Sequence, residues 1–193
     1  MWSSNLINRY QIMPVSRLLT KYRKEVIPAM QAKFGYKNVM QVPKVIKVVL
    51  NIGVGKHLKD DKMLANIEKD LALIAGQKPV PTFSKKSISG FKIRAGMKIG
   101  YKLTLRGSRM YGFMDRLISI ALPRTKDFRG IDAKSFDAKS VLNMGILEHS
   151  VFPEIHYESL KDVFSFEIAV VTNSRKREET VELLKLIGFP IKK

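Results

Sequence analysis

Residues 84–107, which read SKKSISGFKIRAGMKIGYKLTLRG, form the most informative segment of the chain. It combines a glycine-containing basic loop with a strand-like segment at its end. Its cations, with no acidic residue among them, are Lys85, Lys86, Lys92, Arg94, Lys98, Lys102 and Arg106. The 44 residues between Asp70 and Asp115, which include this stretch, contain no Asp or Glu and add Lys78 and Arg109, so they carry +9 of the net charge of +18.

An acid-free segment of this size cannot neutralise itself with salt bridges, so its positive charge needs an external anion. The commonest large polyanion in a cell is nucleic acid. Apolar residues such as Phe91 and Tyr101 are interleaved with the cations, which is typical of surfaces that stack bases while they neutralise phosphates. The alternative is a solvated basic loop whose apolar residues face the core.

The end of this stretch, residues 98–106, alternates apolar and polar residues with the period of a strand. One side would carry Ile99, Tyr101, Leu103 and Leu105, and the other Lys98, Lys102, Thr104 and Arg106. The pattern predicts a half-exposed strand whose open face is polar and positive, and such a sheet face can bind RNA.

The rest of the chain predicts an α+β fold. Helices are expected at 16–34, 60–75, 108–122 and 174–187, with Pro28 bending or splitting the first and Pro123 ending the third. Strands are expected at 44–52, 79–84, 143–148 and 164–172, and residues 123–142 read as an irregular contact segment. We expect a single domain in which helices cover one face of a largely antiparallel sheet, with the other face open and a long basic loop protruding.

Composition limits the function classes. The chain has 193 residues, 45% hydrophobic content and no cysteine, which excludes disulfides, thiolate catalysis and cysteine-ligated zinc. No apolar run approaches the roughly 18 residues that span a bilayer, and the most basic segment is not an amphipathic helix, so no membrane partner is expected.

Residues 1–16 form a basic extension before a domain at 17–193; a transit peptide and an upstream start codon remain open.

Motifs for catalysis are weak. The segment from Asn51 to Lys56 lies between a strand and a helix but lacks the spacing of a phosphate-binding loop. A metal-dependent RNA-processing enzyme would use His57 with Asp60 and Asp61. His149 and His156 with Glu148, Glu154 and Glu158 form a second loose set, and such neighbours are usually solvated surface. We therefore predict a protein that is not an enzyme and that needs no cofactor or metal.

Several ordered motifs resemble one family. They include MQVPK at 40–44, LNIGVG at 50–55, AGQKP at 75–79, KSISGFKIRAG at 86–96, KLTLRG at 102–107, DFRG at 127–130, KSFD at 134–137 and VFPE at 151–154. Together they resemble ribosomal protein five of the large subunit, in its bacterial or organellar form, over residues 17–193. The resemblance implies a non-enzymatic protein of the ribosome, either cytoplasmic or, if residues 1–16 are a transit segment, in an organellar matrix.

The resemblance also implies partners and site residues. The family binds 5S rRNA and helps attach it in the central protuberance, beside 23S-type rRNA and other 5S-associated proteins. The rRNA-binding residues would be Asn51, Gln77, Phe91, Thr104, Lys102 and Arg106. The basic loop would contact the P-site tRNA through Lys85, Lys86, Lys92, Arg94 and Lys98. The irregular segment would form a bridge with small-subunit ribosomal protein thirteen.

Three features depart from the usual family pattern. Residues 1–16 have no counterpart, and residues 137–141 replace a turn that usually contains glycine. Leu147 and His149 stand where the family usually has a basic residue and Gln, so no RNA role is assigned to them.

Overall fold

Five strands form one sheet in which every neighbouring pair is antiparallel, in the order β2-β3-β1-β5-β4. The strands are β1 (Val45–Gly53), β2 (Val80–Phe83), β3 (Lys98–Leu105), β4 (Leu142–Ile146) and β5 (Phe166–Thr172). The computed structural model describes residues 16–55, 60–137, 140–155, 163–174 and 176–192. The predicted α+β architecture with one antiparallel sheet is confirmed.

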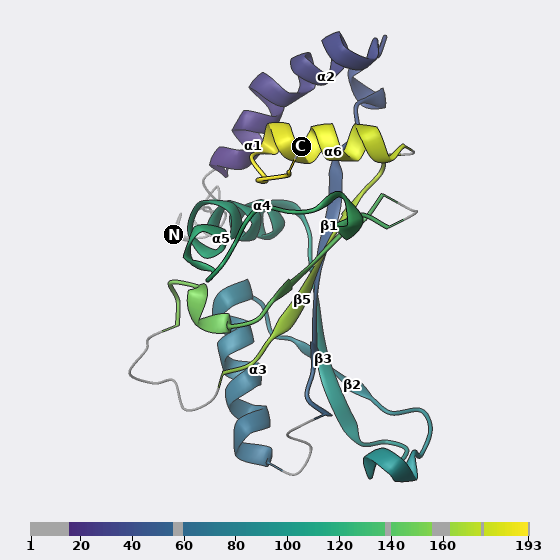
Figure 1. Ribbon diagram of the computed structural model, residues 1–193, viewed down its shortest axis with the longest axis vertical. Coiled ribbons are helices and arrows are strands. Elements are labelled where there is room, and N and C mark those ends of the chain that lie inside the picture. Colours follow the sequence, from purple (N-terminus) through teal and green to yellow (C-terminus); the bar gives the residue numbers. More distant parts are fainter. Residues whose placement is uncertain (1–15, 56–59, 138–139, 156–162, 175, 193) are drawn as a thin grey trace, which may run out of the picture.

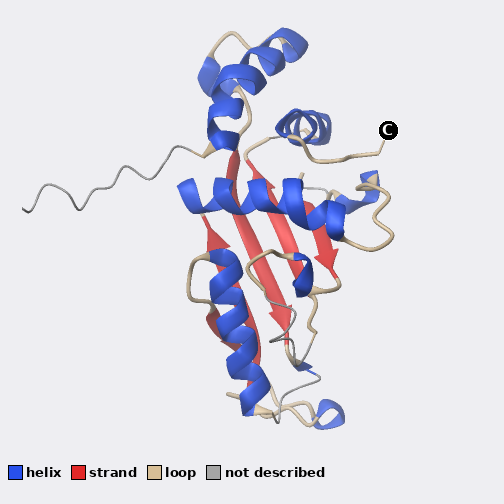
Figure 2. Cartoon of the chain, turned by 90° about the vertical axis from the view of Figure 1, so that its left-hand side faces the viewer, coloured by secondary structure: helices blue, strands red, loops and turns tan. Residues whose placement is uncertain are grey.

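The helices gather on one side of the sheet and at one of its ends. They are α1 (Arg17–Lys21), α2 (Ile27–Phe34), α3 (Asp61–Ala75), α4 (Gly107–Arg116), α5 (Leu122–Arg124) and α6 (Arg177–Ile187). Figure 2 shows α3 and α4 lying across the same face of the sheet, whereas α1, α2 and α6 lie beyond its end (Figure 1). No helix among the described residues is both long and apolar enough to cross a bilayer.

Both prolines that were expected to interrupt helices follow a π-helical turn. The turn η2 (Tyr22–Val26) precedes Pro28, and η6 (Leu117–Ala121) precedes Pro123. Proline lacks an N–H and its ring collides with the carbonyl four residues earlier, so a locally widened turn lets the helical path continue. The helix therefore runs past Pro123 to Arg124, and the prediction that Pro123 ends it is wrong by two residues.

The hydrophobic core lies between α3, α4 and the covered face of the sheet. The inward strand residues include Leu50 of β1, Leu103 of β3 and Ile168 of β5, each at most 2% exposed. Helix α3 buries the predicted stripe, Met63, Leu64, Ile67, Leu71 and Ile74. Asp60 caps the start of α3, where its carboxylate accepts hydrogen bonds from the backbone N–H groups of Lys62 and Met63 at 3.1 Å.

The irregular segment before β4 is pinned to the core by two side chains. Ile131 and Phe136 are buried, and Ile131 forms a parallel bridge with Ile191 near the end of the chain. The turn η7 (Ala133–Ser135) lies between them. Charged side chains, including Arg124, Lys126 and Arg129, point to solvent, as expected for a contact surface.

Candidate nucleic-acid interface

One face of the sheet, called here the open face, carries no helix in the described part of the chain. Strand register sets its residues in rows. One row runs Val80–Lys102–Asn51–Glu167–Gly145 across the five strands, and the next runs Thr104–Val49–Ala169–Asn143. Their side chains are exposed or half-buried, whereas their neighbours along each strand are mostly buried in the core. The open face is thus a shallow polar surface made mainly of short side chains.

Gly100 keeps the strands of the open face in close contact. A Cβ at this position would collide with the carbonyl oxygen of Ile52 and would approach the Thr82 hydroxyl to 2.9 Å. Gly100 pairs with Gly53, so this row of the open face has glycine on both β3 and β1.

The segment between β2 and β3, residues 84–97, is a folded hairpin arm. Ile88 and Ile93 exchange backbone hydrogen bonds of 2.8 and 3.1 Å, and Ser84 and Met97 close its base at 2.9 Å. A 3₁₀ turn, η5 (Ser89–Phe91), forms its tip, where Lys92 adopts a left-handed conformation with φ of 56°. Figure 1 shows the arm extending beyond the sheet at the end farthest from α1 and α2.

The cations of the arm and of the neighbouring strand face solvent. Exposed side chains are those of Lys85, Lys86, Lys92, Arg94, Lys102 and Arg106. No ion pair between described residues involves them. The arm and open face therefore present positive charge that the described part of the protein leaves without a carboxylate.

Comparison with known proteins decides the family. Residues 38–94 match the model of "Ribosomal protein L5", and residues 98–191 match the model of the C-terminal part of the same ribosomal family. The chain belongs to the ribosomal protein L5 family. The open face and residues 84–94 of the arm lie within the matched residues, and the resemblance inferred from the sequence motifs is confirmed.

Bacterial members of the L5 family are similar over nearly their whole length. The large ribosomal subunit protein uL5 of Thermoanaerobacter sp. (strain X514) is 52% identical over 179 residues, 93% of this chain and 100% of the relative. That of Syntrophomonas wolfei subsp. wolfei is 49% identical over 92% of this chain and 100% of the relative. That of Clostridium perfringens (strain 13 / Type A) is 51% identical over 91% and 98%. These relatives are named as ribosomal proteins and not enzymes, which confirms the prediction of a non-enzymatic protein.

The structure brings together some of the predicted rRNA-binding residues and separates others. Asn51, Lys102 and Thr104 share the open face, where Asn51 pairs directly with Lys102. Phe91 lies on the arm and is 73% exposed. Gln77 instead lies in the turn after α3, half-buried, where its side-chain oxygen accepts a 3.4 Å hydrogen bond from Arg109.

Lys98 departs from the predicted alternation of β3. The pairing of β2 with β3 shifts register between Thr82 and Phe83, and this irregularity disturbs the regular alternation. The Lys98 ammonium lies 3.4 Å from the Tyr101 hydroxyl, which donates to the Leu64 carbonyl of α3 at 3.0 Å. The predicted placement of Lys98 beside Lys102 on the open face is therefore wrong.

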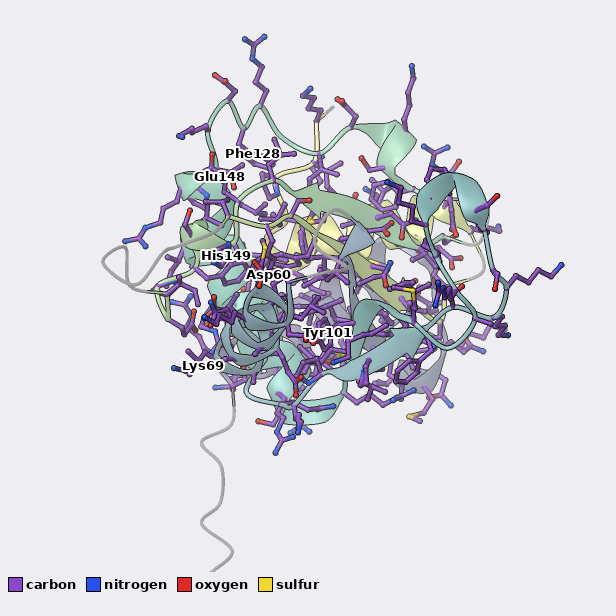
Figure 3. The ribbon with its side chains drawn as sticks, turned by 90° about the horizontal axis from the view of Figure 1, so that it is seen from below. Asp60, Lys69, Tyr101, Phe128, Glu148 and His149 are labelled. Carbon is purple, nitrogen blue, oxygen red and sulfur yellow. The ribbon has the colours of Figure 1, made fainter. Side chains whose placement is uncertain are left out.

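His149 is buried, which corrects the expectation of a solvated histidine. Its ring stacks on Phe164 with a centroid distance of 3.9 Å, and its Nδ1 accepts a 3.3 Å hydrogen bond from the Phe164 backbone N–H. Burial lowers the pKa of His149 and raises that of Asp70, whose carboxylate lies 3.6 Å from Nε2. Figure 3, which looks at the molecule from below, shows His149 and Tyr101 on different sides of α3.

Most of the described residues considered for metal binding have structural partners, whereas Asp61 is exposed in the first turn of α3. Asp60 caps α3, Glu148 pairs with Lys126 at 3.3 Å, and Glu154 pairs with Arg116 at 2.9 Å. No group of three potential metal ligands occurs within the described residues. Three candidates, His57, His156 and Glu158, lie outside the described residues.

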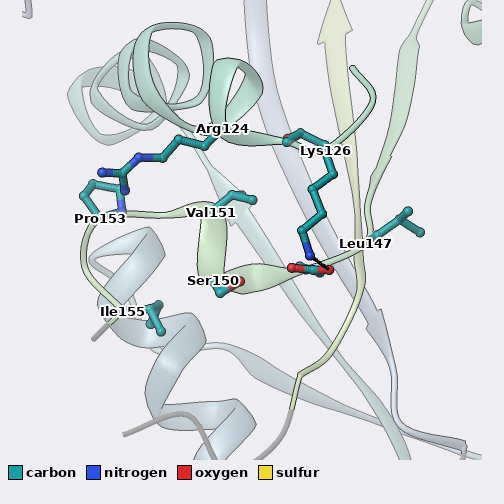
Figure 4. Close-up of a pocket in the computed structure, with 9 residues that line it drawn as sticks. Arg124, Lys126, Leu147, Ser150, Val151, Pro153 and Ile155 are labelled. Atoms are coloured by element: carbon teal, nitrogen blue, oxygen red, sulfur yellow. Dashed lines mark hydrogen bonds and ion pairs between the residues drawn. The ribbon is translucent and has the colours of Figure 1, made fainter. Parts of the chain in front are cut away.

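A hollow of about 470 Å³ separates the end of α5 from the 3₁₀ turn η8 (His149–Val151). Lys126 and Glu148 of its lining form an ion pair of 3.3 Å, and Figure 4 shows Lys126, Val151 and Ile155 around the hollow. Leu147, 76% exposed, lies at its edge. The hollow lies between the irregular segment and the turn after β4, and its lining mixes apolar side chains with polar and charged ones.

Proposed function

We propose that the protein is a structural component of the large ribosomal subunit that binds 5S rRNA and helps attach it in the central protuberance. The observation that carries this proposal is the juxtaposition of the uncovered sheet face with an arm whose exposed cations have no carboxylate partner in the described chain. Membership of the ribosomal protein L5 family supports the same assignment.

The open face is the proposed 5S rRNA surface. Asn51 and Thr104 supply hydrogen-bonding groups, and Lys102 and Arg106 supply charge for phosphates. Phe91 offers an exposed aromatic ring for stacking. Gln77 contributes from the turn after α3, with Arg109 holding its amide.

The arm is the proposed tRNA contact. Its hairpin hydrogen bonds hold Lys85, Lys86, Lys92 and Arg94 on a defined backbone, and Lys98 at its base completes the predicted set. An ordered arm loses less conformational entropy on binding than a disordered one. It could therefore contact the P-site tRNA while the open face stays on the 5S rRNA.

The irregular segment is the proposed bridge to small-subunit ribosomal protein thirteen. Its pinned backbone and outward charges suit a polar protein contact, and neighbouring 23S-type rRNA and 5S-associated proteins would surround it. The ribosome would be that of a bacterial cytoplasm, like that of the relatives named above, and residues 1–16 would be an extension before the domain at 17–193.

A filter-binding titration over a range of salt concentrations tests the proposal. Affinity for 5S rRNA should exceed that for bulk RNA and should fall with salt, with a log–log slope of about −0.7 to −0.9 per phosphate neutralised. Lys102→Ala should make the slope shallower by about 1, whereas Lys62→Ala on the solvent side of α3 should not. Binding without salt dependence and without preference for 5S rRNA would overturn the proposal.

A further inference from the structure

The five strands contain a single acidic residue, Glu167 of β5, and it lies on the open face. Its side chain is exposed, and no described ion pair includes it. An unpaired carboxylate opposes phosphate binding, so its place on an RNA-binding surface needs a chemical reason.

The neighbours of Glu167 are uncharged. Asn51 pairs with it on one side and Gly145 on the other, and Lys102 lies one strand beyond Asn51. Strands two positions apart are about 10 Å apart, so the Lys102 ammonium is available for a phosphate of its own. Gly145 has no atom within 4 Å of a Cβ position, so space remains beside the carboxylate.

Glu167 lines a shallow hollow of about 480 Å³ on this half of the open face. Its polar lining consists of Asn51, Asn143, Ser165 and Glu167, with Gly53 and Gly145 among the remaining residues and no Lys or Arg. The open face therefore combines cations, Lys102 on β3 beside the arm and Lys47 near the start of β1, with a separate patch around Glu167 that offers hydrogen-bond acceptors and amides.

This division matches the chemistry of an RNA minor groove. The wide, shallow minor groove of an A-form helix displays ribose 2′-hydroxyls and base edges, including the guanine 2-amino group, between its phosphates. A carboxylate is an acceptor only, so it binds these donors and repels phosphates. Phosphates alone would favour a cation at this position instead.

We infer that Glu167 is a specificity-determining residue that accepts a hydrogen bond from a minor-groove donor of the bound RNA, with Asn51 and Asn143 beside it. This inference rests on the proposed function, because it assigns a role within the proposed 5S rRNA surface. Glu167 thereby lowers affinity for arbitrary RNA and raises affinity for RNA that presents the donor at the right place.

Glu167→Ala and Glu167→Gln test the inference against 5S rRNA and bulk RNA. Both remove the charge, but only Ala removes the acceptor. We expect Glu167→Ala to weaken 5S rRNA binding by about tenfold or more, Glu167→Gln to weaken it less, and both to bind bulk RNA as tightly as the unmodified protein or more tightly. Glu178→Ala, an equal charge change at an exposed site on α6, should leave the preference for 5S rRNA unchanged.

The alternatives give different results. If Glu167 only repels phosphates, both substitutions tighten binding to both RNAs equally, and the inference is wrong. Unchanged 5S rRNA binding by Glu167→Ala overturns it as well. An unmodified protein that shows no preference for 5S rRNA would instead overturn the proposed function.

Nucleotide-analogue interference identifies the donor. Pools of 5S rRNA carrying sparse inosine in place of guanosine lack single 2-amino groups, and pools carrying sparse 2′-deoxynucleotides lack single hydroxyls. We expect one position whose substitution weakens binding to the unmodified protein but not to Glu167→Ala. If Glu167→Ala abolishes the interference at a position in the inosine pool, the donor is an amino group. If it does so in the deoxy pool, the donor is a hydroxyl. If it does so in neither pool, the hydrogen bond is refuted.

Discussion

The imidazole Nε2 of His149 lies 3.6 Å from the carboxylate of Asp70, with the histidine fully buried and without a hydrogen-bond partner at that nitrogen. This contact joins the turn after β4 to helix α3, 79 residues earlier in the chain. The Nδ1 atom of His149 accepts a hydrogen bond from the Phe164 backbone N–H, so this nitrogen carries no proton and the imidazole is neutral.

The burial of His149 predicts a loss of stability in mild acid. Burial lowers the pKa of His149 below its ordinary value of 6.5, so the unfolded chain takes up a proton there that the folded chain does not. The free energy of unfolding should fall as the pH drops through 6.5. The total loss is at most about 1.4 kcal/mol for each unit by which folding lowers the pKa of His149. Urea titrations at pH values of about 7.5 and 5.5, on either side of the ordinary histidine pKa, measure it.

His149→Phe is the control for this pH effect. Phenylalanine keeps an aromatic ring against Phe164 but cannot titrate, so the difference between the two pH values should shrink. Asp70, whose pKa burial raises from 3.8, acts in the opposite direction at lower pH, so the measurement stays above a pH of about 5.5. An equal pH dependence in both proteins would contradict the assignment to His149.

Two glycine substitutions should change stability in opposite directions. Gly100→Ala places a methyl group against the Ile52 carbonyl and should destabilise the protein by about 1–3 kcal/mol. Gly112→Ala lies inside α4 with nothing within 4 Å of the new Cβ, and it should stabilise the protein by up to about 1 kcal/mol. Chemical denaturation of both variants checks the pair, and a stable Gly100→Ala would show that β1 and β3 can separate without cost.

The sequence predicted what depends on local pattern. The stripe of α3, the alternation of β3 from Tyr101 to Leu105 and the open polar face all follow from periodicity. The burial of His149 could not be predicted this way, because Asp70 and Phe164 approach it only in the folded chain. Lys98 was misplaced because a register shift between strands leaves no mark on the sequence of either.

Phe91 should matter for RNA and not for folding. Because its ring is 73% exposed, Phe91→Ala should change the free energy of unfolding by less than about 0.5 kcal/mol. Loss of a stacked base should weaken 5S rRNA binding by about 1–3 kcal/mol. Met40→Ala, at a site 78% exposed on the 3₁₀ turn η3 (Val39–Gln41), is the matched control and should leave binding unchanged. Equal effects of the two substitutions on binding would remove Phe91 from the interface.

The arm and the open face should separate by function. Lys92→Ala with Arg94→Ala removes two exposed cations from the arm, and it should weaken tRNA contact in reconstituted ribosomes while 5S rRNA binding stays within about threefold. Asn51→Ala with Thr104→Ala removes hydrogen-bonding groups from the open face and should weaken 5S rRNA binding by about 1–3 kcal/mol, with little change in the tRNA contact of assembled ribosomes. Filter binding measures the affinity for 5S rRNA, and chemical footprinting of P-site tRNA measures the tRNA contact. Because the arm is joined to the sheet only through β2 and β3, a disturbance at its tip should not reach Asn51 on β1. Equal losses for both partners in both double variants would mean that the two surfaces bind as one.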